Sequence, residues 1–327
     1  MFQKMIAVVG HACLDIFPQF LSDSSIVPGK LVNVGPVSFA GGGCVSNVGL
    51  ALARLGVPVR LLAKVGRDHF GGVLRALYDE VAPGLAADVI VAKRRATSYS
   101  VVLQPPGVDR TFLHFPGAND TFKAQNIDWA RLAGVRVLHF GYPPLMRHMC
   151  EREGAELAAV FAEARARGMT TTLDMSLPDE ASAASRLDWL AWLARVLPLV
   201  DVFLPSLDEL ALMLRAEPGS APAALARRCR ALGARTVVVK LGARGLLMVD
   251  ERDSETTCRV YAVEHVAGTT GSGDATIAGF LASLLEDPRP RLETLQFACA
   301  VGACSVEAVD GESVSDCSAL LTSSLFH

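Results

Sequence analysis

Short runs of β-branched and other apolar residues alternate along the chain with longer Ala-, Leu- and Arg-rich segments of helical periodicity. Residues 6–10 predict a buried strand, and residues 47–55 predict a helix that ends at Gly56, a residue typical of helix C-termini. The alternation predicts an α/β fold, a doubly wound and mostly parallel sheet flanked by helices, with ligands at the carboxyl ends of its strands. The other predicted strands are 59–65, 135–140, 170–174, 201–204, 236–241 and 246–249, and the other predicted helices are 70–78, 151–167, 185–195, 207–215, 221–232, 273–285 and 291–308.

Two stretches, at about 14–39 and 96–115, lack helical periodicity and contain short alternating or β-branched runs. A Pro-Pro-Gly-Val-Asp run at 105–109 is a turn signal between two of these strands. We predict a small antiparallel sheet that stands off the main body as a lid. Without an internal repeat or a linker, residues 1–327 are expected to form one domain. An exposed sheet of this kind is a candidate surface for a homodimer.

Charge and apolar content narrow the classes of partner. The formal net charge is −3 at pH 7, which gives no electrostatic reason to expect nucleic acid or a membrane as the partner. No apolar run approaches the roughly 18–20 residues that span a bilayer, and the first residues have no signal-peptide pattern. The eight cysteines are scattered through mostly apolar segments. We therefore expect free, buried thiols in a cytoplasmic protein.

The strongest local signal is the Gly271-Ser272-Gly273-Asp274 turn at the start of an apolar helix. Unpaired amides at such a helix start attract anions, and glycines let an anion approach the backbone. Asp274 would then take a proton from a substrate hydroxyl. The alternative is a small-residue turn in which Asp274 merely caps the helix. The local pattern by itself does not choose between these interpretations.

A second glycine-rich segment, at 40–47, opens the helix that contains Asn47. Its glycines would let a polyhydroxylated ligand approach, and Asn47 offers both a donor and an acceptor. Taken alone, the segment favours a simpler interpretation, in which the glycines relieve crowding and Asn47 caps the helix. Asp15 follows the first strand, where a ligand crevice is expected, although a surface aspartate is the commoner case.

Other phosphate-binding motifs are missing. A Walker loop requires a Gly-Lys-Ser/Thr sequence, and no such lysine follows the glycines before Asp274. A dinucleotide fold would place a Gly-x-Gly-x-x-Gly turn after the first strand, but that turn reads from Gly10 to Asp15 without further glycines.

Taken in order, these segments resemble the PfkB or ribokinase-like family of carbohydrate and nucleoside kinases. The resemblance runs almost the full length and implies the fold predicted above, a doubly wound α/β domain with a β-sheet lid. The matching segments are Gly10 to Asp15, 41–47, 65–71, 109–111 with 117–119, Asp208-Glu209, 240–245 and 269–274.

The resemblance also implies roles for individual residues, with ATP and Mg²⁺ as cofactors. Asp274 would be the catalytic base, beside an anion hole at Gly271, Ser272 and Gly273. The substrate hydroxyls would bind to Asp15, Gly42, Gly43 and Asn47. The nucleotide would bind near Ser206, Lys240, Gly242 and Gly245, and Glu209 would hold Mg²⁺ through water.

Three positions depart from the family pattern. Gly268 replaces an aspartate that helps to form a monovalent-cation site, so potassium dependence is not predicted. Ser206 replaces an asparagine, while Glu209 is kept. Tyr142 stands where many sugar kinases carry a substrate-binding acid; its ring would stack on a sugar or base, or would simply be half-buried. The lid aromatics would line the pocket or only pack the lid; they are Phe39, Phe112, His114 and Phe115.

The expected reaction is transfer of the γ-phosphoryl group of ATP to a hydroxyl of a sugar or sugar acid. A nucleoside kinase of the same fold and a non-catalytic ligand-binding relative are the alternatives. The choice among acceptors depends on pocket details that the sequence does not specify.

Overall fold

The main sheet has eight strands. The computed structural model describes residues 4–21, 26, 28–107, 110–263, 265–266, 268 and 271–307. In these residues the order of the main sheet is β14-β13-β12-β11-β10-β9-β1-β4, parallel from β4 to β12 and antiparallel at β13 and β14. The mostly parallel sheet predicted from the sequence is confirmed. Its strands are β1 (Met5–Gly10), β4 (Val59–Leu62), β9 (Val135–Gly141), β10 (Thr170–Leu173), β11 (Val202–Phe203), β12 (Thr236–Lys240), β13 (Leu246–Val249) and β14 (Glu255–Cys258).

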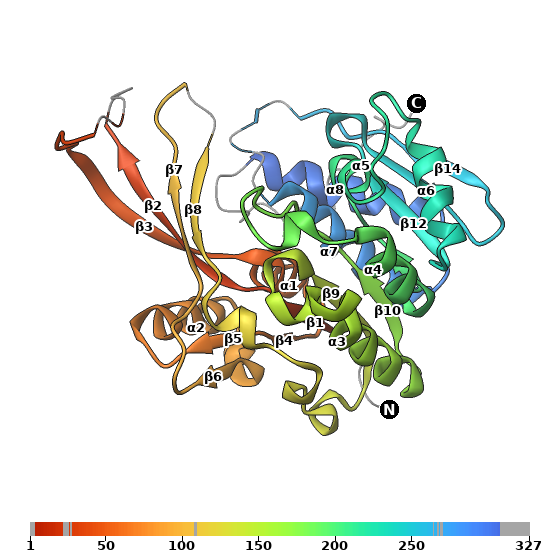
Figure 1. Cartoon of the computed structure of the whole chain (residues 1–327), viewed down its shortest axis with the longest axis horizontal. Coiled ribbons are helices and arrows are strands. Elements are labelled where there is room, and N and C mark those ends of the chain that lie inside the picture. Colours follow the sequence, from red (N-terminus) through yellow and green to blue (C-terminus); the bar gives the residue numbers. More distant parts are fainter. Residues whose placement is uncertain are drawn as a thin grey trace.

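Helices cover both faces of this sheet (Figure 1). Alternate residues of β1 point to opposite faces, so Ile6 and Val8 belong to one apolar core and Ala7 and Val9 to the other. One core is shared with α1 (Gly43–Arg54), α2 (His69–Val81), α7 (Ser272–Glu286) and α8 (Leu292–Glu307). The other is shared with α3 (Arg147–Ala166), α4 (Trp189–Val196), α5 (Leu207–Met213) and α6 (Pro222–Ala231). The sequence predicts these helices to within a few residues at most ends.

A separate four-stranded sheet has the order β3-β2-β7-β8 and extends away from the main body (Figure 1). Its strands are β2 (Cys13–Phe20), β3 (Val34–Gly42), β7 (Tyr99–Leu103) and β8 (Thr111–Phe115). The prediction of a wholly antiparallel sheet is wrong for the central pair, because β2 and β7 are parallel. These two strands are joined through α1, β4 and α2, a connection long enough for a parallel crossover.

The predicted strand at 59–65 is divided. β4 ends at Leu62, and β5 (Lys64–Gly66) pairs with β6 (Ile90–Ala92) in a two-stranded sheet. Single-turn 3₁₀ helices complete the described elements: η1 (Leu85–Asp88), η2 (Gly117–Thr121), η3 (Ala124–Asn126), η4 (Trp129–Leu132), η5 (Pro143–Leu145), η6 (Ala184–Arg186), η7 (Leu197–Leu199) and η8 (Gly242–Arg244).

The described thiols are buried, as predicted, and those of Cys13, Cys44, Cys150, Cys229, Cys258 and Cys299 are free of disulfide bonds; Cys304 is buried as well. Cys317 lies outside the described residues. In the part of the chain that the structure describes, none of the helices is both long enough and apolar enough to cross a membrane.

Candidate active site

A cavity of about 560 Å³ opens at the carboxyl ends of the parallel strands, beside the start of α7. Its volume lies in the range of small-molecule sites. Several of the residues predicted from the sequence line it, together with others that the sequence did not single out. The lining residues are Tyr142, Met175, Ser176, Leu177, Ser206, Leu207, Asp208, Glu209, Lys240, Leu241, Gly242, Arg244, Gly271, Gly273 and Asp274.

Asp274 lies in the first turn of α7 and is 4% exposed. Its Oδ2 accepts a hydrogen bond from Asn47 Nδ2 at 2.8 Å, and the Tyr142 hydroxyl lies 2.9 and 2.8 Å from Oδ1 and Oδ2. The helix is capped instead by Gly271, whose φ of 75° suits a glycine. The interpretation of Asp274 as a mere cap is therefore wrong.

Asn47 is likewise no cap, because α1 already begins at Gly43. Its side chain reaches Asp274 across 227 positions of sequence. The predicted base and one of the predicted substrate ligands are thus in direct contact.

Burial raises the pKa of Asp274 above its ordinary value, because a buried site disfavours the charged carboxylate. The positive charge of Lys240 and the hydrogen bonds from Asn47 and Tyr142 offset part of this effect. A carboxylate with a raised pKa is a stronger base, which suits proton abstraction from an alcohol.

Gly42 and Gly43 make room for side chains at the start of α1. A Cβ atom at Gly42 would overlap the Asp15 carboxylate, and one at Gly43 would lie 2.5 Å from His11 Nδ1. These glycines do relieve crowding, as the simpler interpretation of the segment holds. The crowding side chain at Gly42 is the predicted substrate ligand Asp15, whose pKa burial raises.

One of the lining residues, Lys240, belongs to a buried ion pair. Lys240 Nζ lies 2.6 Å from Asp174 Oδ1, and the Asp174 side chain is fully buried. Burial favours the neutral amine, but the charges of Asp174 and Glu209 outweigh it and hold the pKa of Lys240 above its ordinary value. A cationic Lys240 at this place can attract phosphate oxygens.

Ser206 and Glu209 form a capping box at the start of α5. The Ser206 side chain accepts from the Glu209 amide at 3.2 Å, and Glu209 Oε2 accepts from the Ser206 amide at 2.6 Å. Both residues also line the cavity. The role of Glu209 toward Mg²⁺ stays a prediction, and the capping box fixes the position from which its carboxylate would act.

Two predicted nucleotide-site glycines differ in position. Gly242 lines the cavity, whereas Gly245 is buried at the start of β13, where a Cβ atom would overlap the Cys258 carbonyl oxygen. Its φ of 89° also requires a glycine. Gly245 therefore shapes the turn after β12 without lining this cavity.

Sequence reasoning missed Asp174 and Arg244. Asp174 directly follows β10, as Asp15 follows the first predicted strand, so the same positional signal was present. Arg244 lies on η8, in the segment between Gly242 and Gly245 that was already noted.

Tyr142 takes a left-handed conformation directly after β9, with φ 60° and ψ 43°. Such a backbone is uncommon for a residue other than glycine and is often found at functional sites. The ring of His11 stacks on it at a centroid distance of 6.3 Å. Tyr142 is half-buried, and its hydroxyl contacts the candidate base.

The lid aromatics separate into two groups. Phe39, Phe112 and Phe115 are 43%, 51% and 41% exposed, so they do not form an enclosed aromatic pocket. His114 instead faces His11, with ring centroids 5.2 Å apart.

The backbone amide of Gly268 donates to the carbonyl oxygen of Val306. Thr269 and Thr270, which complete the matching segment, and Asp109 lie outside the described residues.

The donor set of the cavity fits Mg·ATP. The α7 start and the ammonium of Lys240 suit phosphate oxygens, while the carboxylates of Asp208 and Glu209 suit a hydrated Mg²⁺. The buried carboxylate of Asp274 lies beside these groups. Fold and site together are those of an α/β kinase of small molecules.

Comparisons with known proteins lead to the same class of enzyme. The model of the pfkB family carbohydrate kinases matches residues 3–316, and the chain belongs to this family. It is 25% identical over 237 residues to an uncharacterized sugar kinase of Archaeoglobus fulgidus, covering 72% of this chain and 87% of the relative. It is 25% identical over 287 residues to the probable chloroplastic fructokinase-6 of Arabidopsis thaliana, covering 82% and 70%.

Among solved structures, Arabidopsis thaliana ribokinase complexed with ribose and ATP aligns with a TM-score of 0.79 at 20% identity. The alignment covers 96% of this chain and 98% of that one. This likeness confirms the predicted fold, and the family match confirms the predicted class of enzyme, a carbohydrate kinase.

Proposed function

We propose that this carbohydrate kinase transfers the γ-phosphoryl group of ATP to a hydroxyl of a sugar or sugar acid, with Asp274 as the general base. The observation that carries the proposal is the buried Asp274 carboxylate at the start of α7, held by Asn47 and Tyr142. The base is thus positioned where helix amides can stabilise charge on a phosphoryl group.

The acceptor hydroxyl would approach Asp274 from the side of Asp15 and Asn47. Asp274 would take the proton as the acceptor oxygen bonds to the γ-phosphorus and the bond from that phosphorus to the leaving oxygen of ADP breaks. Mg²⁺, when bound, supplies charge neutralisation between the phosphates. Lys240 and the amides of the α7 start would hold the phosphate oxygens, and Glu209 would hold Mg²⁺ through water.

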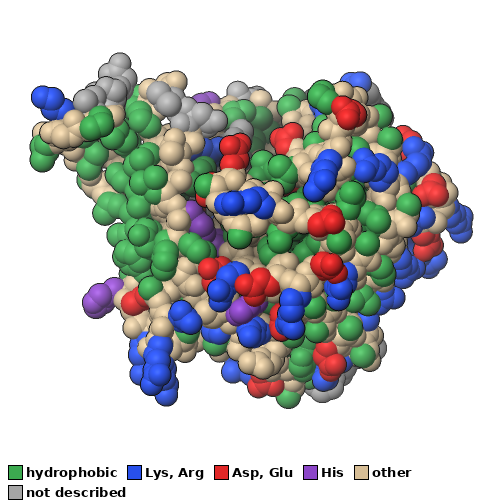
Figure 2. Space-filling model, in the orientation of Figure 1, with side chains coloured by type: hydrophobic (Ala, Val, Ile, Leu, Met, Phe, Trp, Pro, Cys, Tyr) green, Lys and Arg blue, Asp and Glu red, His purple; other side chains and the backbone are tan. Residues whose placement is uncertain are grey.

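The four-stranded sheet β3-β2-β7-β8 would act as a lid. Its strand β2 carries Asp15, so closure would bring this acceptor ligand toward Asp274 and exclude water from the reaction. We also propose that its exposed apolar side chains form a homodimer contact. Figure 2 shows hydrophobic side chains gathered over this sheet, whereas charges are interspersed over the rest of the visible face.

A coupled ADP-release assay with sugars, sugar acids and nucleosides tests the function. We expect Asp274→Asn to lower kcat by about 100- to 10,000-fold, the usual contribution of a general base, while ATP still binds. Asp287→Asn, at the opposite end of α7, is the matched control. Near-normal turnover of Asp274→Asn would contradict the assignment of Asp274 as the general base. Turnover with nucleosides alone would favour a nucleoside kinase, and tight binding of an acceptor without ADP release would favour a non-catalytic relative.

A further inference from the structure

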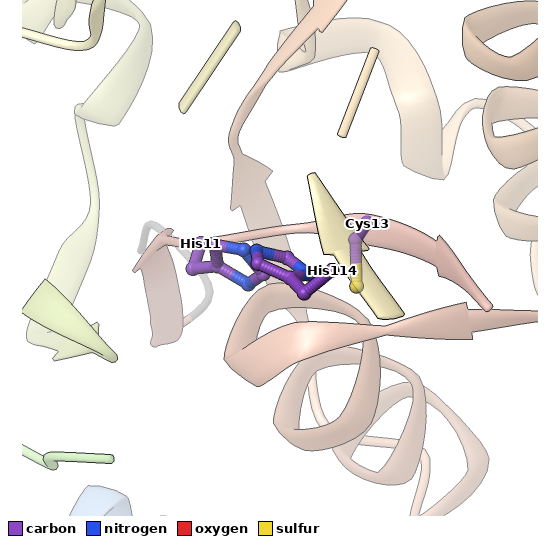
Figure 3. Close-up of side chains that lie close together, drawn as sticks. All are labelled: His11, Cys13 and His114. Carbon is purple, nitrogen blue, oxygen red and sulfur yellow. The ribbon is translucent and has the colours of Figure 1, made fainter. Parts of the chain in front are cut away.

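Three side chains that the proposed phosphoryl transfer leaves unused converge where β2 and β8 of the lid approach the end of β1. His11 follows β1, Cys13 begins β2 and His114 lies on β8 (Figure 3). One potential ligand atom from each residue lies within 4.8 Å of the other two. Three segments that are distant in sequence therefore bring two imidazoles and a thiol together.

His11 lacks the partners that a buried polar group normally has. The residue is 1% exposed, and within the described part of the chain neither ring nitrogen has a hydrogen-bond partner. Burial without a partner is costly, so buried side-chain nitrogens are nearly always paired. A metal ion in this cluster would give one of these ring nitrogens the partner that it lacks.

The surroundings of the other two side chains suit metal ligands. Ser100 Oγ lies 3.0 Å from His114 Nδ1, which leaves Nε2 of that ring available. The same hydroxyl lies 3.7 Å from Cys13 Sγ. Outer-shell partners of this kind orient metal-binding side chains.

We propose that His11, Cys13 and His114 form a binding site for a divalent transition metal of the Zn²⁺ class. Thiolate and imidazole are ligands that Zn²⁺ prefers over Mg²⁺, and three protein ligands leave one position open. In a tetrahedral complex, ligand atoms at zinc bonding distances lie about 3.3–3.8 Å apart. Side-chain rotations that move the ligand atoms by roughly an ångström would thus bring all three to bonding distance from the ion.

Binding requires one proton transfer and no redox change. The Cys13 thiol donates to Asp15 Oδ1 at 3.2 Å, so this carboxylate can take the proton as the S–H bond breaks and the sulfur–metal bond forms. Asp15 would then pass the proton to water. The exposed position of His114 gives the ion a route from solvent.

A bound ion would affect the kinase, a consequence that rests on the proposed function. It would tie β8 of the lid to the end of β1 and occupy space beside Asp15 and Tyr142. We therefore expect Zn²⁺ to inhibit phosphorylation in competition with the acceptor, and chelation by EDTA to restore it.

Metal binding is measured on the full-length, EDTA-treated and reduced protein. Co²⁺ is the probe, because a thiolate ligand gives a charge-transfer band in the near ultraviolet and tetrahedral Co²⁺ gives intense visible bands. We expect one Co²⁺ per chain with both features, displaced by one Zn²⁺. These spectra do not depend on turnover. Failure of the proposed kinase activity would appear as missing ADP release, with the cobalt spectrum intact.

Variants test the ligands. We expect Cys13→Ser to abolish the charge-transfer band, and His114→Leu to weaken Zn²⁺ binding by at least about 100-fold, since even outer-shell losses cost about 10- to 100-fold. His114 lies on an exposed strand, so its replacement keeps the test available if Cys13→Ser fails to fold. His148→Gln and Cys229→Ser are the controls and should bind as the wild type does.

Several results would overturn the proposal: no uptake of either metal, a cobalt spectrum without the thiolate band, or unchanged Zn²⁺ binding in both ligand variants.

Discussion

The Tyr142 hydroxyl lies within hydrogen-bonding distance of both carboxylate oxygens of Asp274, at 2.9 and 2.8 Å. A phenol has one proton, so it can stabilise either oxygen while the other accepts a proton from a substrate. Tyr142 reaches this carboxylate from a left-handed backbone conformation directly after β9. Tyr142 is thus a positioning residue for the proposed base.

Replacement of Tyr142 by Phe should remove this stabilisation of the Asp274 carboxylate. Without the donor, the Asp274 carboxylate is less stabilised and its pKa rises further, so the acid limb of the pH–rate profile should move to higher pH. We expect kcat at neutral pH to fall by about tenfold, the scale of one lost hydrogen bond to a charged group. Tyr99→Phe, which removes a hydroxyl from the lid, is the control. An acid limb that stays in place would argue against the positioning role.

The raised pKa of Asp274 predicts how activity depends on pH. Catalysis requires the ionised carboxylate, so kcat/KM should fall as pH drops through a pKa above the ordinary 3.8. A pH–rate profile whose acid limb disappears in Asp274→Asn, measured on the residual activity, would support the assignment. A limb unchanged by the substitution would assign it to another group.

The same pKa shift has a consequence for stability. Because the folded-state pKa lies above the unfolded one, the folded state is favoured below the unfolded pKa and loses that advantage as pH rises through the folded pKa. Asp274→Asn removes the free-energy cost of burying the ionised carboxylate at neutral pH. We expect the inactive variant to melt at the same or a higher temperature than the wild type at pH 7, as calorimetry can check. A clearly lower melting temperature would contradict this expectation.

The free energy of unfolding should depend on whether the buried charges of Lys240 and Asp174 are both present or both removed. Lys240→Met leaves the Asp174 carboxylate buried without its partner, and we expect a loss of about 3–5 kcal/mol in the free energy of unfolding. The double variant Lys240→Met with Asp174→Leu should regain much of this stability but bind ATP poorly. Denaturant titrations of both proteins measure the difference. Equal destabilisation in both would show that charge burial is not the cause.

Gly42 offers a steric test of the acceptor side. A Cβ atom there would overlap the Asp15 carboxylate, so Gly42→Ala should displace Asp15 and raise the KM for the acceptor by at least about tenfold, about the energy of one hydrogen bond to a charged group. Gly72→Ala on α2 meets no atom within 4 Å and should be neutral or stabilising by about 0.5–1 kcal/mol. A normal KM in Gly42→Ala would mean that Asp15 does not bind the acceptor.

The lid surface predicts the oligomeric state. The large apolar side chains of Phe112 and Leu113, neighbours on β8, are 51% and 54% exposed. Adjacent apolar side chains exposed to this extent are typical of a surface that contacts another protein. We expect sedimentation to show a dimer that dissociates in Leu113→Glu. Leu190→Glu, at an exposed apolar position on α4, is the control. A wild-type monomer at micromolar concentration would exclude this contact.

Much of the fold follows from local pattern. Buried strands such as β9 and β11 are short apolar runs followed by helices, and this alternation leaves few arrangements other than a parallel sheet. The glycine turn before Asp274 was compatible both with a base beside an anion hole and with a helix cap, and only its place in the ordered series of matching segments favoured the base, which stays a prediction. The direction of β7 beside β2 was not predictable, because pairing depends on contacts that local pattern does not encode.

Contacts across the sheet were likewise beyond the sequence. Nothing near Asp174 indicates that it meets Lys240 66 positions later, and nothing near Asn47 indicates that it reaches Asp274. Gly245 illustrates a second limit of matched segments. It lies in a matching segment, yet the close carbonyl of Cys258 explains why it is a glycine. A matched position locates a residue in the fold without stating whether the ligand or the backbone requires it.

Asp274 and Asp15 are attached to very different parts of the molecule. Asp274 sits on a helix whose body is embedded in the core, whereas Asp15 belongs to a strand that runs out into the small sheet. With the roles proposed above, a change in the outer strands would alter the contact that Asp15 makes with the acceptor while leaving the helix that carries Asp274 in place. Exchange of these strands between relatives would then be a modular way to select new acceptors.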